Sequence, residues 1–195
     1  MLRTIVIFFV RLFSVIVFRV KRIGKENVPK TGAYIMCANH KSNFDAPVLV
    51  SCTPRKMNVM AKQELFKNKF ITWFGKKCLV FPVKRGRMDI ESMKHSLSVL
   101  NNGEILMLFP EGTRNGMSKN GRAQNGAAFM AIRTGVPVIP VGIIGDMKPF
   151  HKVTLNYGKP LDFSEYKTNK PEKEVLERVS KEIMENIIML TNDNK

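Results

Sequence analysis

The sequence predicts an α/β fold, in which a single domain with a largely parallel central sheet flanked by helices follows an N-terminal amphipathic membrane-interface helix. Short apolar runs of strand length alternate along the chain with segments whose apolar residues recur at helical spacing. The 195 residues, 44% of them hydrophobic, suffice to bury the core of one domain. No repeat, low-complexity tract or linker divides the sequence. We therefore expect residues 1–24 to form the membrane-associating helix and residues 25–195 to form the domain.

Six apolar runs are the expected strands of the domain, at residues 34–39, 57–61, 78–83, 104–110, 136–143 and 152–158. Helical spacing predicts helices over 42–52, 89–101 and 124–134. A further helix opens at Pro171 and Glu172 and carries apolar residues from Val175 to Leu190. Strands that alternate with helices favour parallel pairing, and ligands of such sheets bind where strands end and helices begin.

The segment 2–20 is apolar apart from five positions, Arg3, Thr4, Arg11, Ser14 and Arg19. Arg11 interrupts the apolar run and Lys21 and Arg22 follow it, which disfavours both a signal peptide and a spanning helix. At about 100° per residue, the basic residues and Ser14 fall within a sector of roughly 160°. We expect an amphipathic helix that lies in the membrane interface, with its arginines at anionic headgroups. The alternative is an ordinary helix docked on the domain's own core.

The chain is strongly basic, with 32 Lys and Arg against 16 Asp and Glu, a net charge of +16. Such a charge implies an anionic partner: nucleic acid, an anionic membrane surface or a phosphorylated substrate. The basic residues are scattered, only three tyrosines and one tryptophan occur, and no recognised nucleic-acid motif is present. We therefore expect no nucleic-acid partner.

The three cysteines, Cys37, Cys52 and Cys78, show no paired spacing and lie in or beside apolar stretches. This pattern is typical of buried free thiols in a reducing compartment. The three histidines lack metal-type spacing with cysteines or carboxylates, so we expect no metal site.

The loop after the first expected strand contains His40 and, five residues later, Asp45. On a regular helix the two would lie on different faces. If His40 lies in a turn and Asp45 in the first turn of the next helix, the carboxylate can accept from one ring nitrogen while the other faces a substrate. This is the histidine–aspartate half of a hydrolase triad, with a substrate hydroxyl in place of serine. The alternative is a helix-capping Asp45 and an ordinary loop histidine.

The loop after the run 104–110 reads Glu111-Gly112-Thr113-Arg114. A glycine flanked by these side chains suits anion capture, because Gly112 permits close backbone approach and Arg114 can bind a phosphate with two hydrogen bonds. The alternative is a turn with a surface salt bridge.

The two loops together, in this order and each at a strand end, resemble the motifs of the glycerolipid acyltransferase family, specifically the bacterial lysophosphatidate acyltransferases. Four other segments are similar to parts of the same family, at 60–66, 81–86, 136–143 and 157–163. The resemblance thus covers residues 25 to 165.

The resemblance implies two catalytic residues, His40 as general base and Asp45 as its orienting partner. Lys62 would lie near the developing oxyanion, the alternative being an ordinary surface lysine. The implied substrate-binding residues hold the phosphate and headgroup of the acceptor or shape the loop that does so: Arg85, Glu111, Gly112, Thr113 and Arg114.

The implied reaction moves a fatty acyl group from an acyl thioester, carried by acyl carrier protein or coenzyme A, to the sn-2 hydroxyl of 1-acyl-sn-glycerol-3-phosphate, which is lysophosphatidate. A thioester is already activated, so we expect no cofactor, and no catalytic Cys or Ser follows from the motifs, so we expect direct transfer. Phosphatidic acid for phospholipid synthesis would form at the cytoplasmic face of the cell membrane, to which the protein would bind peripherally. Alternatives are another lysophospholipid or glycerol-3-phosphate as acceptor, or a thioesterase or lipase using the same His–Asp pair.

Overall fold

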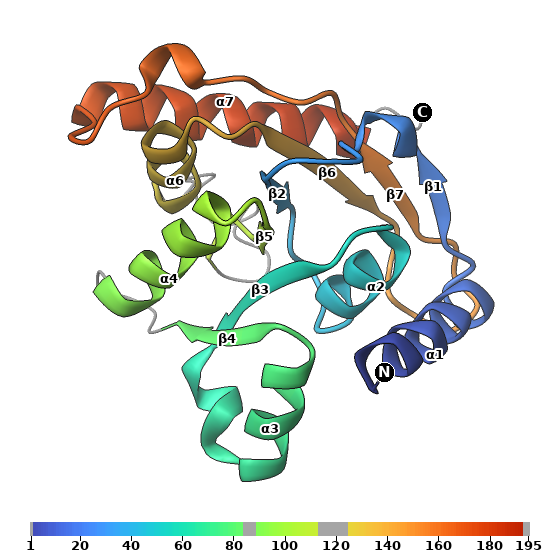
Figure 1. The fold of residues 1–195 in the computed structure, drawn as a ribbon. Helices are drawn as coiled ribbons and strands as arrows, with labels where there is room; N and C mark the ends of the chain where they lie inside the picture. The colour runs from blue at the N-terminus through green and yellow to red at the C-terminus, as the bar shows by residue number, and fades with distance from the viewer. Residues whose placement is uncertain (1, 84–88, 113–124, 193–195) are drawn as a thin grey trace.

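The computed structural model describes residues 2–83, 89–112 and 125–192, which form a seven-stranded sheet with helices on both faces (Figure 1). The strand order is β1-β7-β6-β2-β5-β3-β4. In chain order the strands are β1 (Lys21–Ile23), β2 (Tyr34–Ala38), β3 (Met57–Lys62), β4 (Val80–Val83), β5 (Ile105–Leu108), β6 (Val138–Ile144) and β7 (Thr154–Tyr157).

The sheet is largely parallel, as the sequence predicts. Strands β6, β2, β5, β3 and β4 run in one direction, whereas β7 is antiparallel to β6, and β1 is parallel to β7. The reversal at β7 follows from its connection, because residues 145–153 are too few for the crossover that a parallel strand requires.

The central strands are buried on both faces, which is why they appear in the sequence as continuous apolar runs. Along β2, Tyr34, Met36 and Ala38 face one core cluster and Ile35 and Cys37 face the other, and all five are fully buried. The first cluster lies beneath α1 (Leu2–Val17) and α2 (Asp45–Cys52). The second lies beneath α4 (Ile90–Asn101), α6 (Gly126–Thr134) and α7 (Lys173–Asn192).

The four helices expected in the domain are present, and α2 begins at Asp45 rather than at residue 42. One helix was not expected: α3 (Lys69–Lys77) precedes β4 and lies outside both helical layers (Figure 1). Short 3-10 turns are η1 (Lys25–Asn27), η2 (Gln63–Lys67) and η3 (Ser164–Tyr166).

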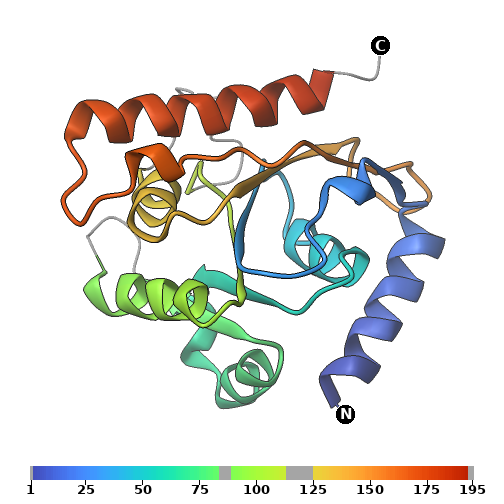
Figure 2. The same ribbon diagram turned by 45° about the horizontal axis from the view of Figure 1, so that its top comes forward.

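Helix α1 packs against α2 on the side of the molecule away from α7 (Figure 2). Its side toward the domain includes Ser14, which is fully buried and donates to the Val10 carbonyl (2.6 Å), and the half-buried Arg3. The polar sector of α1 is therefore directed partly toward the domain and only partly toward solvent. The opposite face exposes seven large apolar side chains, Ile5, Phe8, Phe9, Leu12, Phe13, Val15 and Ile16. No helix in the described ranges has both the length and the apolar character to span a bilayer.

Candidate active site

The two motif loops meet at one edge of the sheet because β2 and β5 are neighbouring parallel strands. Cys37 pairs with Leu108, so residues 39–44 and 109–112 leave their strands at the same level. Strand β6 lies on the other side of β2, with Ala38 opposite Val141. This carboxyl edge is where open α/β sheets bind ligands.

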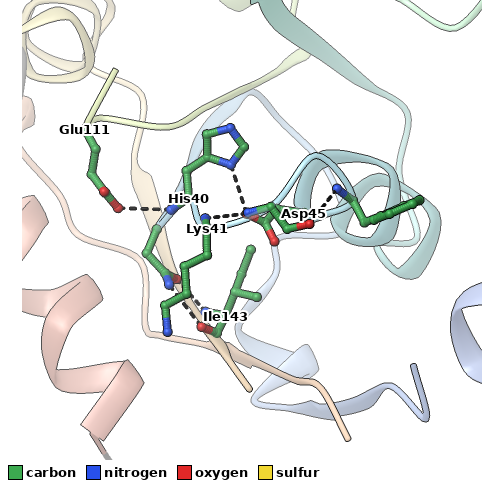
Figure 3. Close-up of polar contacts among 8 residues, drawn as sticks. His40, Lys41, Asp45, Glu111 and Ile143 are labelled. Carbon is green, nitrogen blue, oxygen red and sulfur yellow. Dashed lines mark hydrogen bonds and ion pairs between the residues drawn. The ribbon is translucent and has the colours of Figure 1, made fainter. Parts of the chain in front are cut away.

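His40 and Asp45 form a buried pair, as expected if His40 lies in a turn and Asp45 in the first turn of the next helix. Nδ1 of His40 lies 2.9 Å from Oδ2 of Asp45 (Figure 3). The same Oδ2 accepts from the backbone N–H groups of Lys41 (2.6 Å) and Ser42 (2.7 Å). Asp45 is the first residue of α2, and its recorded partners precede the helix, so it stabilises the loop rather than capping the helix. One carboxylate oxygen thus holds both the loop and the imidazole.

The imidazole is held by a hydrogen bond at Nδ1 and by an aromatic ring against one face. Asp45 is fully buried and His40 is 8% exposed. The Phe109 ring stacks on the imidazole with centroids 4.0 Å apart and planes 12° apart. Because Oδ2 accepts from Nδ1, the proton of neutral His40 resides on Nδ1, and the lone pair on Nε2 points away from Asp45 (Figure 3). This is the protonation state that a general base requires.

Glu111 joins the two loops through the backbone. Its Oε1 accepts from the backbone N–H of His40 at 3.0 Å, and the residue is 6% exposed. Gly112, next in the chain, has φ +65° and donates its N–H to the Phe109 carbonyl at 3.0 Å. A side chain at this φ would be strained, which supports a role for Gly112 in backbone geometry.

Asn39 is a positioning residue that the sequence reasoning missed. Its Nδ2 donates to the Ile143 carbonyl (3.0 Å), and its Oδ1 accepts from the Ile143 N–H (2.6 Å). Asn39 is 1% exposed, and the two hydrogen bonds tie the start of the His40 loop to β6. The sequence shows that Asn39 directly precedes His40 at a strand end. It does not show the hydrogen-bond partner, Ile143, which lies 104 residues away.

Of the remaining candidate residues, the structure describes Lys62 but not the other three. Lys62 ends β3 at the same edge of the sheet, where its Nζ forms an exposed ion pair with Glu64 (3.3 Å). Arg85, Thr113 and Arg114 lie outside the described residues. The structure therefore brings together His40, Asp45, Glu111 and Gly112.

The cysteines are free, as expected, with Cys37 and Cys52 buried and Cys78 half-buried. Burial raises the pKa of the Cys37 thiol, which disfavours the reactive thiolate. In the ranges that the structure describes, no three His, Cys, Asp or Glu side chains are grouped as a metal site.

A histidine oriented by a buried carboxylate, at the carboxyl edge of a parallel sheet, can remove a proton from a hydroxyl group or from water. The fold and the site together are those of an α/β enzyme with a buried His–Asp pair at the ligand-binding edge of its sheet. Residues 19–144 match the family model described as Acyltransferase. The chain belongs to the acyltransferase family, as its motifs predict, and it is an O-acyltransferase.

Similar proteins extend this match along most of the chain. The 1-acyl-sn-glycerol-3-phosphate acyltransferase of Bacillus subtilis is 32% identical over 179 residues, covering 89% of this chain and 88% of that protein. The protein of the same name from Streptococcus pneumoniae is 30% identical, covering 83% of this chain but 62% of its own length. The crystal structure of the 1-acyl-sn-glycerophosphate (LPA) acyltransferase PlsC from Thermotoga maritima is similar with a TM-score of 0.67 at 27% identity, covering 95% of this chain and 81% of that one.

Proposed function

We propose that this enzyme acylates the sn-2 hydroxyl of 1-acyl-sn-glycerol-3-phosphate with a fatty acyl thioester and so makes phosphatidic acid for phospholipid synthesis. The observation that carries the proposal is the buried His40–Asp45 pair, with the Nε2 lone pair directed away from the carboxylate. The names of the similar proteins from Bacillus subtilis and Streptococcus pneumoniae support this acceptor.

In the proposed reaction, Nε2 of His40 takes the proton of the acceptor hydroxyl while the oxygen attacks the thioester carbonyl. The resulting imidazolium is stabilised by the Asp45 carboxylate, which accepts from Nδ1. When the tetrahedral intermediate collapses, the carbon–sulfur bond breaks and the leaving thiolate takes the proton from Nε2. The products are the new ester and a free thiol, so no acyl-enzyme is needed.

The substrates are held, in this proposal, by basic residues of the motif segments. Arg114 and Arg85 bind the acceptor phosphate, with Thr113 and Gly112 in the same loop as Arg114, and Lys62 lies near the developing oxyanion. Glu111 supports the site by positioning the His40 backbone through its hydrogen bond to the His40 N–H. The thioester donor is carried by acyl carrier protein or coenzyme A, both anionic, and the net charge of +16 suits either.

The enzyme is proposed to work as a peripheral protein on the cytoplasmic face of the membrane. The exposed apolar face of α1 would enter the interface, where the acceptor and the product reside. Of the basic residues of this segment, Arg11 and Arg19 are exposed and can meet anionic headgroups.

The test is a product assay with purified enzyme and a radiolabelled acyl thioester, given separately as the carrier-protein and the coenzyme A form. Lysophosphatidate, glycerol-3-phosphate and a neutral monoacylglycerol serve as acceptors. We expect phosphatidate from lysophosphatidate at a rate well above acylation of the other two. Release of free fatty acid as the main product would instead indicate a thioesterase, and preference for another acceptor would overturn the acceptor assignment.

A further inference from the structure

Outside α1, the described residues include six exposed large apolar side chains, and two of them, Phe44 and Phe150, belong to segments that contact the end of that helix. Phe44, 47% exposed, precedes Asp45 in the loop of residues 39–44 that carries His40, which is named the catalytic loop for its proposed role. Phe150, 72% exposed, lies in the connection between β6 and β7. Exposed apolar side chains that gather on one surface are typical of an interaction site rather than of ordinary solvent exposure.

Contacts join these two residues to the end of α1 and to Phe18 just beyond it. The Phe18 ring, just beyond α1, is packed between Phe13 on the helix (centroids 5.6 Å apart) and Phe44 on the catalytic loop (5.4 Å). The backbone N–H of Phe150 donates to the Val17 carbonyl at 2.6 Å. The end of α1, the catalytic loop and the β6–β7 connection are thus held together.

The backbone of Phe150 adopts a conformation that is unfavourable for a residue with a bulky side chain. Its φ is +65°, in the left-handed region, where a bulky residue is uncommon and costs free energy. Exposure to water adds a second cost. The hydrogen bond to Val17 and a second one from Val153 to Phe18 (3.0 Å) hold the connection in place. An exposed aromatic side chain on a backbone held by hydrogen bonds is suited to insertion into the apolar part of a bilayer.

Exposed cations accompany these apolar side chains in the same segments, at Arg11, Arg19, Lys41, Lys148 and Lys152. The acidic residue of the connection, Asp146, is paired with Lys148 at 3.1 Å. A hydrogen bond from Lys148, together with its charge, lowers the pKa of Asp146, so this carboxylate stays ionised and paired with Lys148. Apolar side chains accompanied by cations complement an anionic phospholipid surface.

We propose that the exposed face of α1, Phe44 and Phe150 form one docking surface for an anionic phospholipid bilayer, on which Phe150 anchors the catalytic loop at the lipid. This docking surface extends the membrane role proposed above for α1 alone. It places Phe44, and with it the loop of His40, at the interface. An acceptor therefore keeps its acyl chain in the bilayer while its headgroup and hydroxyl reach the imidazole.

The direct test measures whether the side chain at position 150 enters the bilayer. Phe150→Trp is made in a Trp73→Phe background, which removes the single native tryptophan. The variant is mixed with vesicles of equal phosphatidylglycerol and phosphatidylcholine that carry brominated acyl chains. We expect quenching and a blue shift of the emission from the introduced tryptophan. The matched control is Met189→Trp in the same background, at a 54% exposed site on α7 in the opposite helical layer, which should remain unquenched.

A second test separates docking from catalysis. Phe150→Asp should lower acylation of a bilayer-presented acceptor about tenfold or more, while acylation of a short-chain, monomeric acceptor stays unchanged. Met189→Asp should change neither rate. Unquenched emission from the Phe150→Trp variant in the presence of vesicles, or full bilayer activity of Phe150→Asp, would overturn the docking surface. The quenching assay contains no acceptor, so its outcome is independent of whether lysophosphatidate is the substrate.

Discussion

Oδ2 of Asp45 accepts three hydrogen bonds, two from the loop backbone and one from the His40 imidazole. The same atom therefore determines where the imidazole lies and which ring nitrogen carries the proton. This local arrangement could be predicted from the sequence, because His40 and Asp45 are five residues apart and only a turn into a helix brings them together. The hydrogen bond that Glu111 accepts and those that join Asn39 to Ile143 could not be predicted, because the partners lie 71 and 104 residues away in the chain.

Asp45→Asn should keep an acceptor oxygen for the loop but remove the negative charge that stabilises an imidazolium. We expect kcat to fall by about 10²- to 10⁴-fold. The midpoint of thermal unfolding should change little, whereas Asp45→Ala, which also frees two backbone N–H groups, should lower it clearly. Steady-state kinetics with thermal unfolding of both variants is the measurement. Unchanged kcat in Asp45→Asn would contradict the role given to the carboxylate.

Variants of Glu111 distinguish positioning of His40 from direct binding of the headgroup. Glu111→Gln keeps an acceptor for the His40 N–H, so kcat should stay within a few-fold of the wild type. Glu111→Ala leaves that buried N–H unsatisfied, which costs about 1–3 kcal/mol of stability. It should lower kcat with little change in the acceptor KM. An increase confined to KM, in both variants, would show instead that the carboxylate acts on the acceptor.

At the level of the elements, the six expected strands correspond to β2 through β7. The central strands are buried on both faces, so they leave continuous apolar runs in the sequence. Strand β1 escaped notice because its three residues, Lys21–Ile23, are mostly charged and exposed. Helix α1 was recognised, but which of its sides faces the domain depends on packing against α2, which the periodicity of one helix does not specify.

Strand β6 and α7 approach so closely that Gly142 leaves no room for a side chain. A Cβ atom there would lie 2.6 Å from the Leu190 carbonyl oxygen. Gly142→Ala should therefore lower the free energy of unfolding by about 1–3 kcal/mol. Gly126→Ala is the control, because a Cβ at the start of α6 meets open space and should be neutral or stabilise by about 0.4–1 kcal/mol. Guanidinium unfolding measures both, and equal stabilities would refute the close approach.

On the scale of the whole molecule, the sheet separates two helical layers, and α1 adds a broad apolar face to one of them. The catalytic loop and the β6–β7 connection lie beside the end of this helix. The sequence indicated an anionic partner through its charge, but the neighbourhood of α1, Phe44 and Phe150 depends on tertiary contacts between distant segments.

Binding to anionic vesicles should depend on ionic strength because of the net charge of +16. Raising salt from about 0.1 M to 1 M shortens the Debye length from about 10 Å to 3 Å. We expect the fraction that sediments with phosphatidylglycerol vesicles to fall several-fold, while weaker binding to pure phosphatidylcholine vesicles changes little. Equal salt dependence for both compositions would argue against attraction by the anionic surface.

The most direct test of the account is the rate of phosphatidate formation by the wild-type enzyme and by His40→Ala, measured with radiolabelled acyl thioester and lysophosphatidate in mild detergent. The account predicts phosphatidate from the wild type and a loss of roughly 10²-fold or more in the variant. Circular dichroism should confirm that the variant is folded. Full activity in a folded His40→Ala enzyme would contradict the proposal that this histidine is the general base.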